Sequence, residues 1–340
     1  MLFVRKTAFK KIGSSILLIL TFGCGQDLKH SPPKEKFSQP ITVRLDWLIT
    51  GHSLPLVVAK EKGFYNQYGI NVTLSEGRGD LLTCELVSNG QETIGLADAS
   101  TGALAISKGA NIKYVAVFVQ KTPSSIIFYP DKKIKTPEDL KGKRGGVNSA
   151  GAATVLLKAV LEQHDISTNQ LNLTIMAPRS KQAALLGKKV DYINGYISGD
   201  YLSVVLKAPN LQAIPYHTWD INALSTGLIV HPDTIEKYPD LIQNFVTATI
   251  KGWHYTLDHP REASSIGISH FPMTNQDVLE QGIEANRSLL HTPNSKGKPL
   301  GWMAKDDWEQ TVQLMYRYGG SNPPLELDRY FTNRFVEGKQ

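Results

Sequence analysis

Residues 43–64, VRLDWLITGHSLPLVVAKEKGF, join a predicted strand to a predicted helix. Apolar and polar residues alternate at the start of this stretch, which is the pattern of a half-buried strand, and a helical pattern follows from residue 55. The connecting loop holds a carboxylate, a large aromatic ring and an imidazole in Asp46, Trp47 and His52. Ligands of open α/β sheets bind beyond the carboxyl ends of the strands, so this loop is a candidate binding element.

The same order of strand and helix recurs along the chain after residue 40. Expected strands at ITVRL, INVTL, TIGLA and YVAVFVQ alternate with helical patterns up to residue 120. This order predicts a mostly parallel sheet with helices on both faces. A second series starts at SIIFYP, residues 125–130, and STGLIVH, residues 225–231, reads as a strand that returns to the first series.

These two series predict an α/β fold of two lobes, in which the second lobe interrupts the first. We expect lobe 1 to comprise residues 41–122 and 222–340, and lobe 2 to comprise residues 123–221. The chain would cross between the lobes near residues 121–124 and 216–225, which predicts a two-stranded hinge. A cleft between the lobes gathers strand ends from both, and we expect the ligand there.

The N-terminal residues predict export. Residues 1–23 begin with four basic residues and no acid, and continue with an apolar run of roughly 13 residues, too short to span about 30 Å of hydrocarbon. This pattern predicts a secretory signal peptide. The run ends in TFGC, which resembles a bacterial lipobox with Thr21 in place of the usual Leu, so lipidation is expected at Cys24. Plain secretion and an uncleaved anchor are the alternatives.

Charge and cysteine content bound the function. Residues 24–40 are polar, contain Pro and show no periodicity, which predicts a flexible tether behind the lipid. Removal of the four basic residues of the signal peptide lowers the net charge from +6 to about +2 (6 − 4), and no basic stripe remains to indicate nucleic acid. Cys84 is the one cysteine besides Cys24, so the sequence predicts neither an intramolecular disulfide nor a cysteine metal site.

Enzyme motifs are missing from the sequence. It contains no Gly-x-Ser-x-Gly turn between a strand and a helix, and no His-Glu-x-x-His helix. Cys84 lies in an apolar helical pattern with Leu81, Leu82 and Leu86, which fits a core position better than a catalytic one. We therefore expect no catalytic residue, no metal and no cofactor.

Several motifs resemble the type II periplasmic binding proteins that serve importers of thiamine pyrimidine precursors, a group that includes alkanesulfonate, taurine and nitrate binding proteins. The matching segments are RLDWLITGH and VVAKEKGFYNQYGINV, then LVSNG (86–90), IGLAD (94–98) and KYPDLIQNFV (237–246), and together they span most of residues 41–265. The resemblance implies a two-lobed protein, periplasmic or on the cell surface, that captures a small molecule and passes it to an ABC permease without chemistry. We expect it to be a monomer held at the membrane by its lipid.

The resemblance also implies a ligand and its contacts. Pyrimidine-binding members cover the heterocycle with an aromatic side chain, and Trp47 stands at the matching position; the alternative is that Trp47 caps the core of lobe 1. Those members carry an acidic residue on the second lobe after a Gly-aromatic stretch. The matching segment, residues 191–201, offers Tyr196 and Asp200 but no Glu.

Further candidates come from two other strand ends. The loop of residues 146–154 carries Asn148, Ser149 and Ala150 before a helix, where free N–H groups favour an anion or a carbonyl-like acceptor; a capped loop without a ligand is the alternative. Asp98 and Ser100 follow the strand TIGLA. His52 fits either a ligand contact or a loop residue bonded to backbone, and Asp46 either accepts from a ring amino group or caps the loop.

Three other functions stay open from the sequence. The same fold could bind a sulfonate or nitrate anion, or serve as a ligand-sensing lipoprotein with no transporter. Fungal pyrimidine-precursor synthases share the fold, but they are intracellular and carry a cysteine-rich segment. This chain has an export signal and one cysteine beyond it. The sequence therefore favours a binding protein for a thiamine pyrimidine precursor or a related nitrogen heterocycle.

Overall fold

The computed structural model describes residues 40–149, 151–272 and 275–337. The predicted signal peptide, Cys24, residues 24–39 of the predicted tether, and Ala150 lie outside the described residues. Within the described part of the chain, no helix is both long and apolar enough to cross a membrane.

Two five-stranded sheets organise the protein, and we call the parts that carry them lobe 1 and lobe 2. The sheet of lobe 1 has the order β2-β1-β3-β10-β4 and the sheet of lobe 2 has the order β7-β6-β8-β5-β9. The strands of lobe 1 are β1 (Ile41–Arg44), β2 (Val72–Ser75), β3 (Ile94–Asp98), β4 (Lys113–Val117) and β10 (Thr226–Val230). Those of lobe 2 are β5 (Ser124–Phe128), β6 (Arg144–Val147), β7 (Asn172–Ile175), β8 (Tyr192–Tyr196) and β9 (Gln212–Pro215).

Each sheet is half parallel, where the sequence predicts a mostly parallel one. In lobe 1, β1 pairs in parallel with β2 and β3, whereas β10 is antiparallel to β3 and β4. In lobe 2, β6 pairs in parallel with β7 and β8, whereas β5 is antiparallel to β8 and β9. The antiparallel strands β10 and β5 are those that enter a sheet from the other lobe. Their direction is therefore not set by a helical crossover.

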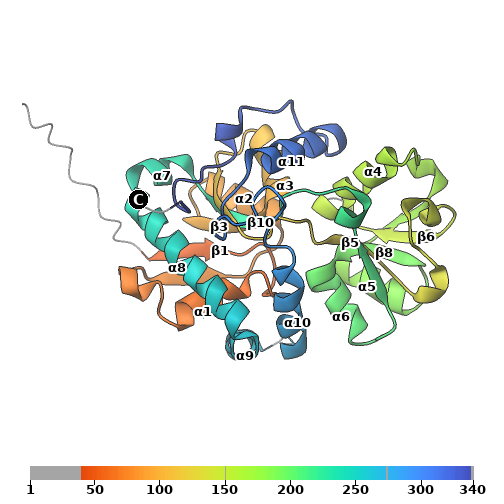
Figure 1. Ribbon diagram of the computed structural model, residues 1–340, viewed down its shortest axis with the longest axis horizontal. Helices are drawn as coiled ribbons and strands as arrows, with labels where there is room; N and C mark the ends of the chain where they lie inside the picture. Colours follow the sequence, from red (N-terminus) through yellow and green to blue (C-terminus); the bar gives the residue numbers. More distant parts are fainter. Residues whose placement is uncertain (1–39, 150, 273–274, 338–340) are drawn as a thin grey trace, which may run out of the picture. The chain divides into compact units, whose positions relative to one another are not determined.

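Helices cover both faces of each sheet (Figure 1). In lobe 1, α1, α8 and α9 lie on one side and α2, α3 and α11 on the other, and in lobe 2, α4 lies opposite α5 and α6. The helices are α1 (Leu54–Glu61), α2 (Asp80–Ser88), α3 (Ala99–Ser107), α4 (Ala152–Gln163), α5 (Pro178–Leu186), α6 (Leu202–Val205), α7 (Pro232–Lys237), α8 (Pro239–Asp258), α9 (Pro260–His270), α10 (Gln276–Arg287) and α11 (Lys305–Tyr318). A π-helix, η5 (Ile197–Tyr201), follows β8 directly.

The longest helix, α8, shows why the C-terminal third folds back onto lobe 1. Its apolar residues repeat at helical spacing, and Phe245, Ala248 and Gly252 are buried, while Leu241 is half-buried. A Cβ on Gly252 would collide with α1, so glycine lets the two helices approach closely. The core of lobe 1 is thus shared between segments far apart in the sequence.

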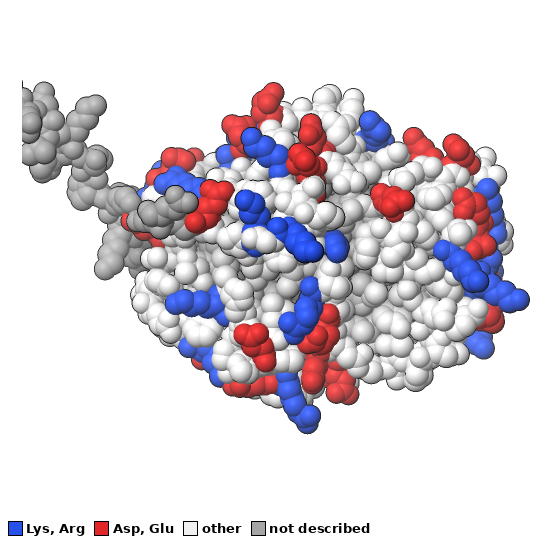
Figure 2. Space-filling model, viewed as in Figure 1, with Lys and Arg blue, Asp and Glu red and all other residues white. Residues whose placement is uncertain are grey.

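The surface carries charges of both signs. Figure 2 shows Lys and Arg side chains interspersed with Asp and Glu over the visible face, with wide uncharged areas between them. The acidic side chains of Asp46 and Asp98 in the candidate site are buried, near the carboxyl ends of β1 and β3.

Candidate ligand-binding site

The loop after β1 is held rigidly against the segment that leads into α2. Gly79 N donates to the carbonyl oxygen of Asp46 at 2.8 Å, and Gly77 N donates to that of Trp47 at 3.0 Å. A Cβ on Gly77 would lie only 2.5 Å from the carbonyl carbon of Asp46, so no larger residue fits there. The backbone that presents Asp46 and Trp47 therefore has one position.

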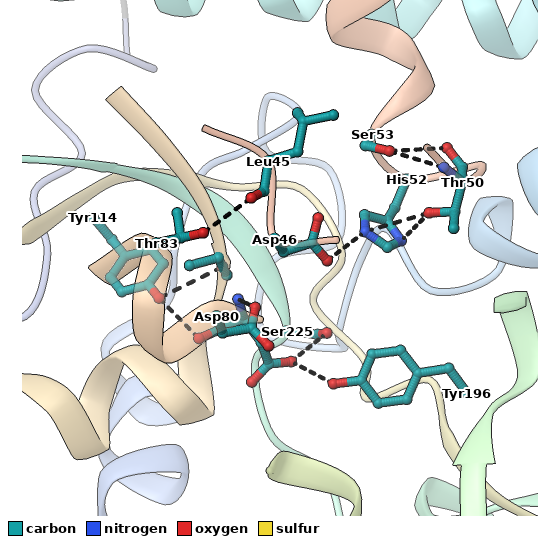
Figure 3. A network of polar contacts seen from close by, with 12 residues as sticks. Leu45, Asp46, Thr50, His52, Ser53, Asp80, Thr83, Tyr114, Tyr196 and Ser225 are labelled. Atoms are coloured by element: carbon teal, nitrogen blue, oxygen red, sulfur yellow. Dashed lines mark hydrogen bonds and ion pairs between the residues drawn. The ribbon is translucent and has the colours of Figure 1, made fainter. Parts of the chain in front are cut away.

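His52 joins Asp46 to Thr50 within the same loop (Figure 3). Its Nε2 lies 2.9 Å from Asp46 Oδ2, and its Nδ1 lies 2.9 Å from Thr50 Oγ1. The imidazole is buried and bonded to side chains rather than to backbone, so its role in this geometry is to position Asp46. The other carboxylate oxygen, Asp46 Oδ1, is buried and has no hydrogen-bond partner among the described residues.

Asp98 connects the two lobes. It ends β3 and caps α3, because its Oδ1 accepts from the backbone N–H groups of Ser100 (2.9 Å) and Thr101 (3.2 Å). Its Oδ2 accepts from Ser225 Oγ at 2.7 Å and from the hydroxyl of Tyr196 at 3.2 Å. Ser225 belongs to the segment that re-enters lobe 1, whereas Tyr196 ends β8 of lobe 2 and points at this group (Figure 3).

A third carboxylate lies beside these two. Asp80, the first residue of α2, accepts from the backbone N–H of Asp98 at 2.8 Å. We call Asp46, Asp80 and Asp98 the acidic cluster. No Lys or Arg among the described residues forms an ion pair with it, and His52 is its one ionic partner there. The cluster therefore concentrates negative charge at the carboxyl ends of β1 and β3.

The pKa values reflect this crowding. Burial, together with the neighbouring carboxylates of Asp46 and Asp98, raises the pKa of Asp80 to about 7. Burial also raises the pKa of Asp98, against the hydrogen bonds that it accepts from Ser225 and others. Burial would lower the pKa of His52, but the charge and hydrogen bond of Asp46 raise it above its ordinary value. Each shift favours the protonated form in the folded protein.

We expect Asp80→Asn to stabilise the protein at high pH. The pKa of Asp80 is about 7 in the folded protein and 3.8 in the unfolded chain, so the protonated carboxyl favours the folded state. This stabilisation is complete below pH 3.8 and is lost as the pH rises through about 7. Asn keeps an oxygen acceptor for Asp98 N and has no charge, so the variant should gain on the order of 1–3 kcal/mol at pH 8 over wild type. The gain should vanish near pH 4. Urea unfolding at both pH values measures it, and an equal difference at pH 4 and pH 8 would contradict the assignment.

The loop after β6 offers polar groups in lobe 2. Asn148 Oδ1 is buried without a partner among the described residues, and the Asn148 carbonyl accepts from Thr154 Oγ1 at 3.0 Å. Ser149 is exposed. Helix α4 follows Gly151, which has a φ of 102° that favours glycine and gives no side-chain cap. The α4 N-terminus is thus uncapped by its own side chains.

The indole of Trp47 is exposed, with 44% of its surface accessible. It is not among the buried residues that form the core of lobe 1. Leu48, Leu81 and Leu82 are also exposed, on the same loop and the first turn of α2. We call these four residues the apolar rim. The rim lies next to the acidic cluster in sequence and along α2.

The fold brings together some of the predicted residues and not others. Asp46 is bonded to His52 and Asp98 to Tyr196, and the charge of Asp98 also acts on His52. Figure 3 shows Asp46, His52 and Tyr196 in this region. Ser100 is buried and donates to the carbonyl of Leu224, so its hydroxyl stabilises the return crossing. Asp200 accepts from Gln182 and from the backbone N–H of Tyr196, which supports that tyrosine.

Two members of the network are not evident in the sequence. Asp80 reads as an ordinary acidic residue in the first turn of a helix, and Ser225 as the start of a strand. One signal was available for Asp80, because Gly77 and Gly79 precede it and permit the tight approach to the first loop. No cluster of three or more His, Cys, Asp or Glu residues suited to a metal ion occurs within the described ranges.

Two hollows of the surface lie away from this site. One of about 610 Å³ lies on lobe 2 around Ile214, and one of about 600 Å³ lies between Lys158 and Arg317. Neither is lined by a residue of the acidic cluster or the apolar rim. The site rests on its polar groups, not on the size of a hollow.

Residues 50–263 match a protein-family model described as NMT1/THI5 like. The match covers more than half of the 340-residue chain. It includes His52, Asp80, Asp98, Asn148 and Tyr196.

Curated relatives align over nearly the whole chain. The riboflavin-binding protein of Chloroflexus aurantiacus is 23% identical over 91% of this chain and 89% of its own length. The formylaminopyrimidine-binding protein of Halalkalibacterium halodurans is 21% identical over 95% of this chain and 98% of its own length. A 4-amino-5-hydroxymethyl-2-methylpyrimidine phosphate synthase of Legionella pneumophila is 23% identical over 87% of this chain and 92% of its own length.

Solved structures give the same fold. The periplasmic aliphatic sulphonate binding protein of Escherichia coli superposes with a TM-score of 0.69 at 18% identity, over 86% of this chain and 96% of that chain. A Candida albicans protein described as having the generic periplasmic binding protein fold superposes with a TM-score of 0.64 at 16% identity, over 89% and 99%. The chain therefore belongs to the NMT1/THI5-like family and has the two-lobed fold of the periplasmic solute-binding proteins of ABC importers.

Proposed function

We propose that this protein binds a flat nitrogen heterocycle that carries N–H donors, such as a thiamine pyrimidine precursor, outside the cytoplasm and delivers it to an ABC permease. The observation that carries the proposal is the acidic cluster, which meets Tyr196 of the other lobe and keeps one carboxylate oxygen, Asp46 Oδ1, without a partner among the described residues. An amino group or protonated ring nitrogen of the ligand supplies the missing donor.

The same cluster argues against a sulfonate or nitrate ligand in this region. Two like charges 4 Å apart repel by about 4 kcal/mol at the effective dielectric constant of about 20 that suits such sites. An anion placed beside Asp46, Asp80 and Asp98 would add to a crowding of acidic groups that already raises the pKa of Asp80, with no Lys or Arg paired to them in the described residues. The relatives named for riboflavin and formylaminopyrimidine, both flat nitrogen heterocycles, agree with this choice.

The apolar rim supplies the second half of the proposed site. An exposed indole offers a flat face, and aromatic pairs gain about 0.5–1.5 kcal/mol beyond the burial of their area. In our proposal Trp47 lies over the heterocycle while Asp46 accepts from its edge. The rigid loop after β1 presents both groups at once, which lowers the entropy lost on binding.

Binding, rather than catalysis, is our proposal for this chain, although one relative is named as a synthase. The one cysteine among the described residues, Cys84, is fully buried, and burial raises the pKa of its thiol far above the ordinary value, so the thiolate is not available as a nucleophile. Turnover of pyridoxal phosphate to a pyrimidine phosphate by the purified protein would reverse this conclusion.

Titration calorimetry tests the ligand class. The probes are 4-amino-5-hydroxymethyl-2-methylpyrimidine, formylaminopyrimidine and riboflavin on one side, and taurine, an alkanesulfonate and nitrate on the other. We expect at least one heterocycle to bind and the three anions to give no heat. Heat from an anion, together with no heat from any heterocycle, would contradict the proposal.

The proposed setting is the periplasm or the cell surface, with processing before Cys24 and lipid on that cysteine. We expect Cys24→Ala to move the protein from the membrane fraction to the soluble fraction, or to leave the signal peptide uncleaved. Labelling with a fatty-acid analogue, followed by fractionation, measures this. Wild-type protein that never incorporates the label, and that fractionates like Cys24→Ala, would show that there is no lipid anchor.

A further inference from the structure

Lys181 of α5 is fully buried. Its Nζ has one hydrogen-bond partner among the described residues, Asn194 Oδ1 at 3.4 Å, and it forms no ion pair there. A buried ammonium is costly unless an opposite charge or several acceptors surround it. Two of the three N–H donors of Lys181 therefore have no acceptor among the described residues.

The ammonium of Lys181 is bonded just past the point where β6 and β8 stop pairing in lobe 2. A Cβ on Gly146 of β6 would touch Lys181 Cγ at 3.5 Å, so the stem of the lysine crosses that strand on the face shared with Ile193. Asn194 follows Ile193 in β8, so its side chain points to the opposite face of the sheet. The pairing of β6 with β8 ends at Ile193, one residue before Asn194. The side chain of Lys181 thus passes around the end of β6, where open α/β sheets bind ligands.

A continuous polar network leads from Lys181 to the loop after β6. Asn194 accepts from Lys181 with its oxygen and donates to Thr154 Oγ1 at 3.2 Å. Thr154 Oγ1 donates in turn to the carbonyl of Asn148. Three residues, from β8, α4 and the loop, are thereby linked in a chain of hydrogen bonds to the buried lysine of α5.

Among the described residues, the one carboxylate that acts on Lys181 electrostatically forms no ion pair with it. Asp200 attracts the ammonium, but its Oδ1 accepts from Gln182 at 2.9 Å and its Oδ2 accepts from Tyr196 N at 3.0 Å. Burial lowers the pKa of Lys181 despite Asp200. An added oxyanion would restore the charge balance that the protein alone does not provide.

We propose that Lys181 is a specificity residue that donates to an oxyanion carried by the ligand at the end opposite its amino-bearing edge. This inference rests on the proposed function, since it places a heterocycle between the acidic cluster of lobe 1 and Lys181 of lobe 2. The ligand class is then an amino-heterocycle with a phosphate or carboxylate substituent. A separate inorganic ion beside a neutral heterocycle has the same oxyanion chemistry, and the test distinguishes the two.

The test compares wild type, Lys181→Met and a matched control, Lys189→Met, which changes an exposed lysine just beyond the same helix. The probes are 4-amino-5-hydroxymethyl-2-methylpyrimidine, the same compound with added inorganic phosphate, and its phosphate ester. We expect wild type and Lys189→Met to bind the ester at least tenfold more tightly than the alcohol. Lys181→Met should lose that preference by roughly 10- to 150-fold, the range for a hydrogen bond to a charged group. Equal gains from the ester and from free phosphate would identify a separate ion and overturn the ligand-borne assignment.

Stability separates this role from a structural one. Met fills a similar volume and removes a buried charge without an ionic partner, so Lys181→Met should melt at or above the wild-type temperature. A variant that melts several degrees lower and loses the alcohol and the ester equally would show that Lys181 holds the fold, and would overturn the proposal.

Failure of the proposed function has a different signature. If neither pyrimidine binds wild type, the ligand class is wrong, and Lys181 is judged by inorganic phosphate alone. Phosphate should then raise the melting temperature of wild type and Lys189→Met but not of Lys181→Met. Equal shifts in all three proteins, or no shift in any, would overturn the assignment of Lys181.

Discussion

Trp47→Ala is expected to weaken binding of the cognate heterocycle by roughly 30- to 1,000-fold, the range that corresponds to about 2–4 kcal/mol for a central aromatic contact. The indole is exposed in the described structure, so its removal costs little folding energy, and the loss should appear in affinity. Calorimetric titration of a variant that melts like wild type measures it.

Trp47→Phe is the matched control for the stacking geometry. A phenyl ring keeps a flat face over the ligand, so this variant should retain much of the affinity that Trp47→Ala loses. Leu325→Ala, which trims an exposed leucine outside the proposed site, controls for a general loss of apolar surface. Wild-type affinity in a folded Trp47→Ala protein would show that the indole does not cover the ligand.

Asp46→Asn is expected to weaken binding of an aminopyrimidine by roughly 10- to 150-fold, which corresponds to the 1.5–3 kcal/mol of a hydrogen bond to a charged group. The unpartnered Oδ1 is the acceptor that our proposal assigns to the ligand, and the substitution removes its charge. It also replaces the ionic partner of His52 with a neutral one. Titration at pH 7 and pH 8 measures the effect.

A second variant separates direct contact from positioning. Thr50→Val removes the side-chain hydrogen bond to His52 Nδ1 but leaves Asp46 charged, so it should cost less affinity than Asp46→Asn. Equal losses in the two variants would mean that the orientation of His52, and not the carboxylate oxygen, limits binding.

The first loop was predictable because its pattern is local. A strand, a polar loop and a helix follow one another within residues 43–64, so Asp46, Trp47 and His52 are evident as a group. Asp98 was predictable for the same reason, as the polar residue that ends an apolar strand and caps the next helix. The bond between Asp46 and His52 was not, because spacing along a loop does not fix which side chains face each other.

Other parts of the site depend on contacts distant in sequence. Asp80 meets Asp98 because α2 packs beside β3, and a lysine in a short helical pattern such as that of Lys181 reads as solvated. The antiparallel direction of β10 and β5 could not be predicted from the sequence either, since an apolar strand has the same pattern in both directions. Periodicity predicts elements and their order, whereas charge burial is set by the packing of elements against each other.

Native mass spectrometry of the purified protein shows whether a small molecule is bound, and its mass. We expect wild type to retain a small molecule with the mass of a nitrogen heterocycle, and the Asp46→Asn, Trp47→Ala double variant to release it while staying folded. A retained sulfonate, or a heterocycle held equally well by the double variant, would contradict a site formed by the acidic cluster and Trp47.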